Sequence, residues 1–284
     1  MKNFKLLSIL NFAAFLFHLL LSILSNIKGV LSDNTVADIS HKYETIFTPA
    51  GITFSIWGVI YVFLLGFCIY HLYNAFTKPA SNSANRDTVL MSWLFIINNL
   101  ATGFWLIAWV NDYLFLSVVL ILIQLGTLLS LILRLGIFDI YNSLVNKVLT
   151  QTSLSIYFAW ICIATIANIS AYLVSIGYAS TSSQAFSWTI AVCIFATIIS
   201  IFTIINRRNV VLGLVVVWAF YGIILKNQNL DSAIYANILK TLWFCVGIIG
   251  ATTVIQYFKN EKLKRLKGIS KNSKLPFSTG EGKG

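Results

Sequence analysis

Acidic residues are scarce in this chain, and none lies in the middle of an apolar stretch. The 284 residues include only nine Asp and Glu, and each falls in a predicted loop, at the end of an apolar stretch or in the C-terminal tail. Carriers and pumps that are coupled to ions need an ionisable group at membrane depth to bind and release the ion. The sequence therefore argues against ion-coupled transport and leaves uncoupled transport open.

Prolines and cysteines are also few. The three prolines lie outside the apolar stretches, at Pro49, Pro79 and Pro276. Nothing in the sequence therefore marks the broken helices that are common near transporter midplanes. The four cysteines are Cys68, Cys162, Cys193 and Cys245. Each lies alone in a different stretch, without a CxxC pair, which is typical of small apolar packing residues, so we expect neither a metal site nor a disulfide set.

The residue sets of an enzyme site are missing as well. Acid–base and nucleophilic catalysis need a base within hydrogen-bond reach of its partner. The chain has only three histidines, and it offers no Ser/His/Asp set, HExxH motif or phosphate-cradling glycine loop. The segment 31–47 gathers Asp33, Asp38, His41 and Glu44, which suit either a bound cation or, more simply, a solvated loop. We expect a protein that is not an enzyme.

Apolar residues dominate what is present, since 58% of the chain is hydrophobic and 10% is charged. A helix needs about 20 apolar residues to cross a bilayer. Eight stretches are candidates: Phe4 to Val30, Ile52 to Phe76, Val89 to Val110, Tyr113 to Leu133, Val148 to Ile176, Ala185 to Ile205, Val210 to Leu225 and Ala233 to Phe258. The first is too long for a signal peptide and is expected to remain as an anchor. The sequence predicts an all-α, polytopic membrane helix bundle of eight transmembrane helices.

The basic residues predict the orientation of these helices. If the N-terminus is cytoplasmic, all five arginines fall in gaps on the inner side of the membrane. Only four of the 20 Lys and Arg residues then lie outside or near the outer interface, namely Lys28, Lys42, Lys226 and Lys240. Inner loops of membrane proteins carry an excess of Lys and Arg. We therefore expect both termini in the cytoplasm and the protein in the plasma membrane of the cell.

The C-terminal tail carries much of the formal net charge of +11. Its run KNEKLKRLKGISKNSK follows the last stretch directly. Such a run can bind the anionic headgroups of membrane lipids, or it can serve as a topology signal in a solvated tail, which is the simpler reading. Nucleic acid is not needed to explain the charge, and we expect no nucleic-acid partner.

Polar and aromatic residues recur at helical spacing inside the stretches, so that each set shares one helix face. The sets are Asn11, His18, Ser22 and Ser25; Trp57, Tyr61, Cys68 and His71; Asn98, Thr102, Trp105 and Trp109; and Trp160, Ala164, Asn168 and Tyr172. A polar side chain that faces lipid has no partner, so these faces should point inward. They form either hydrogen bonds between helices or the wall of a ligand cavity, and the sequence leaves both open.

Three of the apolar stretches contain sequence segments that resemble those of a known family. FTPAGITFSIWGVIY places Pro49 eight residues before Trp57, which precedes Tyr61 by four, and FAWICIATIAN places Trp160 eight residues before Asn168. The third segment is NNLATGFWLIAW. Over about residues 1–177 the chain resembles the TspO/MBR family of tryptophan-rich sensory proteins and translocator proteins.

The resemblance implies a five-helix TspO-like core at 1–177. The apolar and basic stretches that follow predict three additional transmembrane helices at 178–258, which have no counterpart in the five-helix family, and a basic cytoplasmic tail at 259–284. The resemblance also implies a tetrapyrrole or a sterol-like ligand, and it is compatible with a homo-oligomer. Two positions depart from the family pattern. Thr48 replaces the first proline of a pair, and Gly51 replaces a tryptophan that lines the family's ligand pocket.

We expect a non-enzymatic integral membrane receptor or sensor that binds an apolar or amphipathic small molecule. Its candidate ligand-binding residues are Gly51, Trp57, Tyr61, Asn98, Trp105, Trp160, Ala164 and Asn168. The aromatic rings would supply contact area, and the two asparagines would orient a polar edge of the ligand. The alternative is a facilitative transporter or channel for a small solute, in which the same faces line a path.

Overall fold

The computed structural model describes residues 3–136, 143–178, 182–228 and 233–272. Within these ranges the chain is helical and contains no strand. The elements are α1 (Phe4–Leu24), α2 (Val36–Lys42), the 3-10 turn η1 (Gly51–Ser55), α3 (Ile56–Thr77), α4 (Ser83–Met91), α5 (Leu94–Val110), α6 (Leu114–Arg134), α7 (Leu144–Asn146), the π-helical turn η2 (Lys147–Thr152), α8 (Ser153–Ser175), α9 (Ser182–Arg207), α10 (Val210–Asn227) and α11 (Ala233–Asn272). The predicted fold class is confirmed.

The number of predicted spans is confirmed with one change. Seven helices in the described residues are long and apolar enough to cross a membrane, and there are eight when α4 and α5 count as one bent span. These two helices meet at an angle of 59°. The absence of proline had predicted unbroken spans, but the break occurs at Ser92, whose φ of +52° is one that residues with a side chain seldom adopt. This backbone conformation interrupts the helix without proline.

The first and last spans differ from their predicted lengths. α1 ends at Leu24, because the side chains of Ser25 and Asn26 both donate to the carbonyl of Ser22, at 3.0 and 2.8 Å, and so bond to the last turn of the helix. At the other end, α11 does not stop at Phe258 but continues to Asn272 through the first part of the basic tail.

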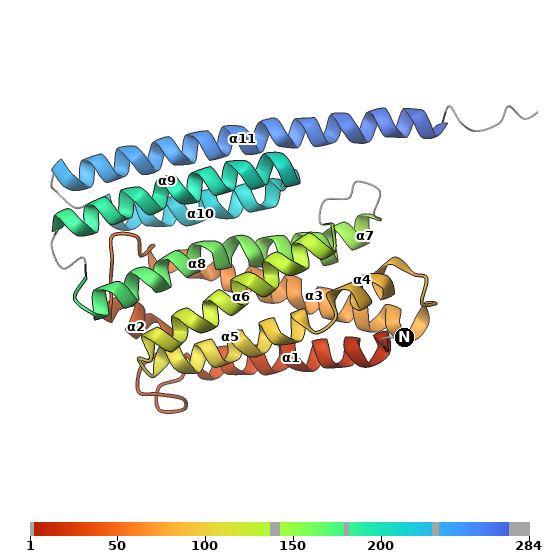
Figure 1. The fold of residues 1–284 in the computed structure, drawn as a ribbon, viewed down its shortest axis with the longest axis horizontal. Coiled ribbons are helices and arrows are strands. Elements are labelled where there is room, and N and C mark those ends of the chain that lie inside the picture. Colours follow the sequence, from red (N-terminus) through yellow and green to blue (C-terminus); the bar gives the residue numbers. More distant parts are fainter. Residues whose placement is uncertain (1–2, 137–142, 179–181, 229–232, 273–284) are drawn as a thin grey trace, which may run out of the picture.

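The helices form two groups that lie side by side (Figure 1). One contains α1, α3, α5, α6 and α8, and the other contains α9, α10 and α11. Helix α10 joins them, since it packs on α8 and on η1 as well as on α11. The start of α1 and the end of α11 lie at the same end of the bundle in Figure 1, as an even number of spans requires.

The predicted polar stripes face the interior, as expected. All four residues of the first set are at most 9% exposed. His18 is fully buried, and its Nδ1 lies 3.1 Å from Oδ1 of Asn99 on α5. The hydroxyls of Thr102 and Tyr157 are 2.6 Å apart and join α5 to α8. Hydrogen bonds between helices therefore account for part of these stripes.

Candidate functional site

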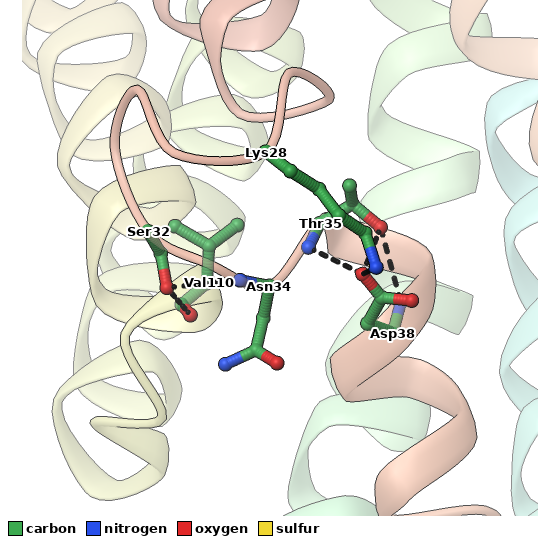
Figure 2. A network of polar contacts seen from close by, with 6 residues as sticks. All are labelled: Lys28, Ser32, Asn34, Thr35, Asp38 and Val110. Atoms are coloured by element: carbon green, nitrogen blue, oxygen red, sulfur yellow. Dashed lines mark hydrogen bonds and ion pairs between the residues drawn. The ribbon is translucent and has the colours of Figure 1, made fainter.

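A short cap, made of the loop after α1 and helix α2, covers one end of the five-helix group. Figure 2 shows how its polar side chains hold it in place. Ser32 donates its hydroxyl to the carbonyl of Val110 at the end of α5, at 2.8 Å. Thr35 and Asp38 form a reciprocal capping box at the start of α2, in which each side chain accepts from the other residue's backbone N–H. Lys28 adds an ion pair to Asp38 at 3.1 Å.

The capping box also fixes the charge of Asp38. The backbone N–H of Thr35, the ammonium of Lys28 and the hydroxyl of Thr35 together lower the pKa of this carboxyl from 3.8 to about 2. Since the pKa is depressed in the folded state, the stabilisation is complete above about pH 4 and is lost as the pH falls through about 2. The Asp38 carboxyl is therefore ionised and able to accept from Thr35 and Lys28 at any physiological pH.

Two further ion pairs tie the end of the cap to both helix groups. Lys42 pairs with Asp112, in the turn between α5 and α6, and the hydroxyl of Tyr43 donates to the same carboxylate at 3.1 Å. Glu44 pairs with Lys226 on α10. Two of the three carboxylates that had suggested a cation site, Asp38 and Glu44, are thus paired with lysines, and the described residues contain no group of three metal-ligating side chains.

A cavity of about 470 Å³ lies beneath this cap. This volume falls in the range of small-molecule sites, about 300 to 1,000 Å³. Its walls come from α1, α2, the segment before α3, α3 itself, α5 and α10, and the lining residues are Ser22, Asn26, Val36, Ala37, Ser40, His41, Glu44, Thr48, Pro49, Ala50, Gly51, Phe54, Trp57, Tyr61, Trp105, Leu106 and Lys226.

A second lobe of about 60 Å³ shares seven of these residues and reaches α8, and it is more apolar. Trp57 stands between the two lobes. It stacks on Tyr61 with ring centroids 5.7 Å apart and meets Trp160 edge to face at 6.3 Å. Phe54 also meets Trp160 edge to face, at 6.0 Å. The rings contact one another in geometries that aromatic pairs prefer, which stabilises this wall.

Seven of the eight residues predicted from the sequence line the cavity. Gly51 and Tyr61 line the larger lobe, Trp57 and Trp105 line both, and the smaller lobe is lined by Trp160, Ala164 and Asn168. Asn98 lines neither lobe. It is fully buried, and its amide donates to the carbonyl of Gln124 and to the hydroxyl of Thr127 on α6, at 3.1 and 3.0 Å. In the structure this side chain joins two helices.

Two polar groups of the smaller lobe, the Asn168 amide and the Trp160 indole N–H, differ in what they have left to offer a ligand. Asn168 accepts from Nε1 of Trp105 at 2.8 Å and donates to the hydroxyl of Ser117 at 2.8 Å, so it holds the Trp105 ring in place. Nε1 of Trp160 has no hydrogen-bond partner among the described residues, although the side chain is only 2% exposed. A buried donor without an acceptor is costly.

Comparison with known proteins agrees with this arrangement. The family model for TSPO-like proteins matches residues 8–255, which is most of the chain. The chain belongs to the TSPO-like family. No curated protein matches it, and no solved structure does.

The TSPO-like match corrects one expectation. The resemblance was expected to end near residue 177, but the match continues through α9 and α10 and into α11. The contacts of α10 show that this helix supports the cavity together with the first five spans. Trp218 donates its indole N–H to the carbonyl of Thr53 at 3.1 Å, and Asn227 donates to the carbonyl of Ile46 at 3.1 Å. The segment that forms one wall of the cavity thus rests on α10.

Sequence reasoning missed several lining residues of this TSPO-like site. Phe54 lies in the same signature segment as Trp57, three residues earlier, and this helical spacing was a usable signal. The cap residues Val36 and Ser40 line both lobes. They lie in a short helix between spans, where nothing in the sequence indicates over which part of the bundle the helix folds.

Proposed function

We propose that the protein is a non-enzymatic membrane receptor or sensor that binds an apolar or amphipathic small molecule in the cavity beneath the cap. The observation that carries the proposal is the unpaired, buried N–H of Trp160 in a largely apolar lobe. Aromatic walls provide contact area, and a few placed polar groups orient the ligand. Trp160 supplies such a group, which favours a ligand with at least one hydrogen-bond acceptor.

The distribution of charge supports an amphipathic ligand. His41, Glu44 and Lys226 all line the larger lobe, where the cap meets α10. The smaller lobe contains no ionisable side chain other than Tyr43. A molecule with an apolar body and a polar end would therefore place its body against Trp57 and Trp160 and its end near the cap. Sterols and tetrapyrroles have this character.

A facilitative transporter is the alternative, and the packing below the cavity argues against it. Tyr157 is fully buried and stacks with His18 at 6.4 Å, next to Trp57. Further along the bundle Phe67 and Phe95 are fully buried and 4.8 Å apart. These side chains close the interior between the cavity and the other end of the five-helix group. A flux assay in proteoliposomes beside a binding assay separates a receptor from a transporter.

Intrinsic tryptophan fluorescence tests the binding site directly. Metal-free protoporphyrin, titrated into the purified full chain, should quench the fluorescence saturably, and Trp57→Phe should weaken the apparent affinity because this ring lies between the two lobes. The matched control is Trp243→Phe. Trp243 is 52% exposed on α11 and lines neither lobe, so its removal should leave the apparent affinity unchanged. Equal effects of both substitutions would contradict the proposed site.

The orientation with cytoplasmic termini, in the cell's plasma membrane, belongs to the same proposal, because it places the cap outside. A cysteine at Asn34, which is exposed in the cap, should react with an impermeant thiol reagent in intact cells. A cysteine at Ser81, which is exposed between α3 and α4 at the other end, should react only after the cells are opened. The background should lack the four native cysteines. Labelling at Ser81 in intact cells would show that the orientation is the opposite of the proposed one.

A further inference from the structure

A second hollow lies at the other end of the bundle, where the two helix groups meet. This inner cleft has a volume of about 270 Å³. It is bounded by η2 and the start of α8, by the turn between α9 and α10, and by α11, and its lining residues are Lys147, Gln151, Thr152, Arg208, Val210, Val211, Tyr257, Asn260, Glu261 and Lys264. None of these residues lines the ligand cavity beneath the cap.

The inner cleft is positively charged. Lys147, Arg208 and Lys264 contribute three cationic groups and Glu261 one carboxylate. That carboxylate already accepts a hydrogen bond from Lys264. The guanidinium of Arg208 forms no ion pair with any carboxylate of the described residues. An anion that enters the cleft therefore meets an excess of positive charge and an Arg that can donate from two nitrogens at once.

A buried amide in the cleft supports the same conclusion independently. The Gln151 side chain is only 5% exposed, and its Nε2 has no hydrogen-bond partner among the described residues. The residue belongs to the π-helical turn η2, and π-helical turns are frequent at functional sites. An unpaired buried donor is costly unless something accepts from it. In this cleft the missing acceptor would be an oxygen of the bound anion.

We infer that the inner cleft binds a phosphate group at the membrane surface. Guanidinium, ammonium and amide groups are all donors, and a phosphate offers several acceptor oxygens together with negative charge. α10 begins at Val210 in the cleft wall, so the positive end of its helix dipole adds to the field. Val210, Val211 and Tyr257 provide an apolar wall beside these donors. Such basic pockets between transmembrane helices suit the headgroups of anionic lipids.

Thermal unfolding of the purified full chain in detergent tests this inference. Phosphatidylglycerol should raise the unfolding temperature saturably, and phosphatidylcholine, whose headgroup has no net charge, should not. Inorganic phosphate, compared with chloride at equal ionic strength, distinguishes a soluble phosphate from a lipid headgroup. If only phosphatidylglycerol shifts the unfolding temperature, the cleft binds a lipid headgroup. If inorganic phosphate shifts it as well, the cleft accepts a phosphate group from lipid or from solution. No saturable shift with either would overturn the inference.

Matched variants tie the effect to the cleft. Lys264→Gln and Arg208→Asn should each weaken the affinity about fivefold, which corresponds to about 1 kcal/mol per basic group. Asn is chosen because Arg208 has a φ of +54°, which Asn tolerates. Lys262→Gln removes the same charge from an exposed position of α11 outside the cleft and should keep the full response. An equal loss of affinity in Lys262→Gln would mean that the basic helix attracts anionic lipids in general, and it would overturn the proposed site.

Discussion

Gly222→Ala should destabilise the protein and disrupt the cavity beneath the cap, although it adds a single methyl group. A Cβ at this position of α10 would collide with both the hydroxyl and the Cβ of Thr53 in η1. Thr53 is only 1% exposed. The backbone N–H of Ala50 also donates to the carbonyl of Gly222 at 2.9 Å. Because Ala50 and Thr53 are both hydrogen-bonded to α10, η1 cannot yield easily, and inserting a methyl group into such packing costs about 1 to 3 kcal/mol.

The effect should extend to ligand binding, because η1 carries one wall of the cavity. Ala50, Gly51 and Phe54 line the larger lobe and lie within four residues of Thr53. If the added methyl moves η1 away from α10, the Phe54 ring moves with it and loses its edge-to-face contact with Trp160. We therefore expect a lower unfolding temperature together with a weaker apparent affinity for protoporphyrin in the fluorescence titration.

Gly247→Ala is the matched control. It makes the same change in another long helix of the same group, α11, where a Cβ would meet nothing within 4 Å. An alanine in a helix interior is favoured over glycine by up to about 1 kcal/mol, so this variant should be as stable as the native chain or more so. If both variants behave alike, the contact between α10 and η1 contributes little to the cavity.

The contrast between these two glycines shows where sequence reasoning stops. Helical periodicity identified the inward faces of the spans, because a polar group that faces lipid is unfavourable whatever the neighbouring helix is. It therefore predicted that Trp57, Trp105 and Trp160 point inward, and the structure brings these three together around one cavity. Nothing in the sequence distinguishes Gly222 from Gly247, because the difference lies in a neighbour far away in the chain.

Two other features depended on the same kind of distant information. The break at Ser92 has no proline or glycine to mark it, and it is visible only in the folded backbone, as a positive φ. The cap is polar enough to be read as a solvated loop, yet Asp112 and Lys226 pair with its Lys42 and Glu44 from other parts of the chain. The sequence shows how many charged side chains the cap carries, but it does not show with which residues they pair.

The sequence predicted the same ligand-binding role for Asn98 and Asn168, because both lie on helix faces that carry aromatic residues. Substituting each by leucine should show that their roles differ. Asn168→Leu leaves Nε1 of Trp105 buried without its acceptor. Stranding a buried donor costs about 1 to 3 kcal/mol, so the unfolding temperature should fall. The Trp105 ring also loses the bond that orients it within both lobes, and we expect the affinity for the quenching ligand to fall about tenfold, the equivalent of about 1.4 kcal/mol.

Asn98→Leu should be much milder, because the partners of Asn98 keep other hydrogen bonds. The hydroxyl of Thr127 still donates to the carbonyls of Ile123 and Gln124, at 2.7 and 2.9 Å, so the Gln124 carbonyl also remains paired. The substitution even removes a buried acceptor, Oδ1 of Asn98, that has no partner among the described residues. We expect a stability change below about 1 kcal/mol and unchanged ligand affinity, measured by the same unfolding and fluorescence titrations. A tenfold loss of affinity in Asn98→Leu would instead place the ligand against α6, outside both lobes of the cavity.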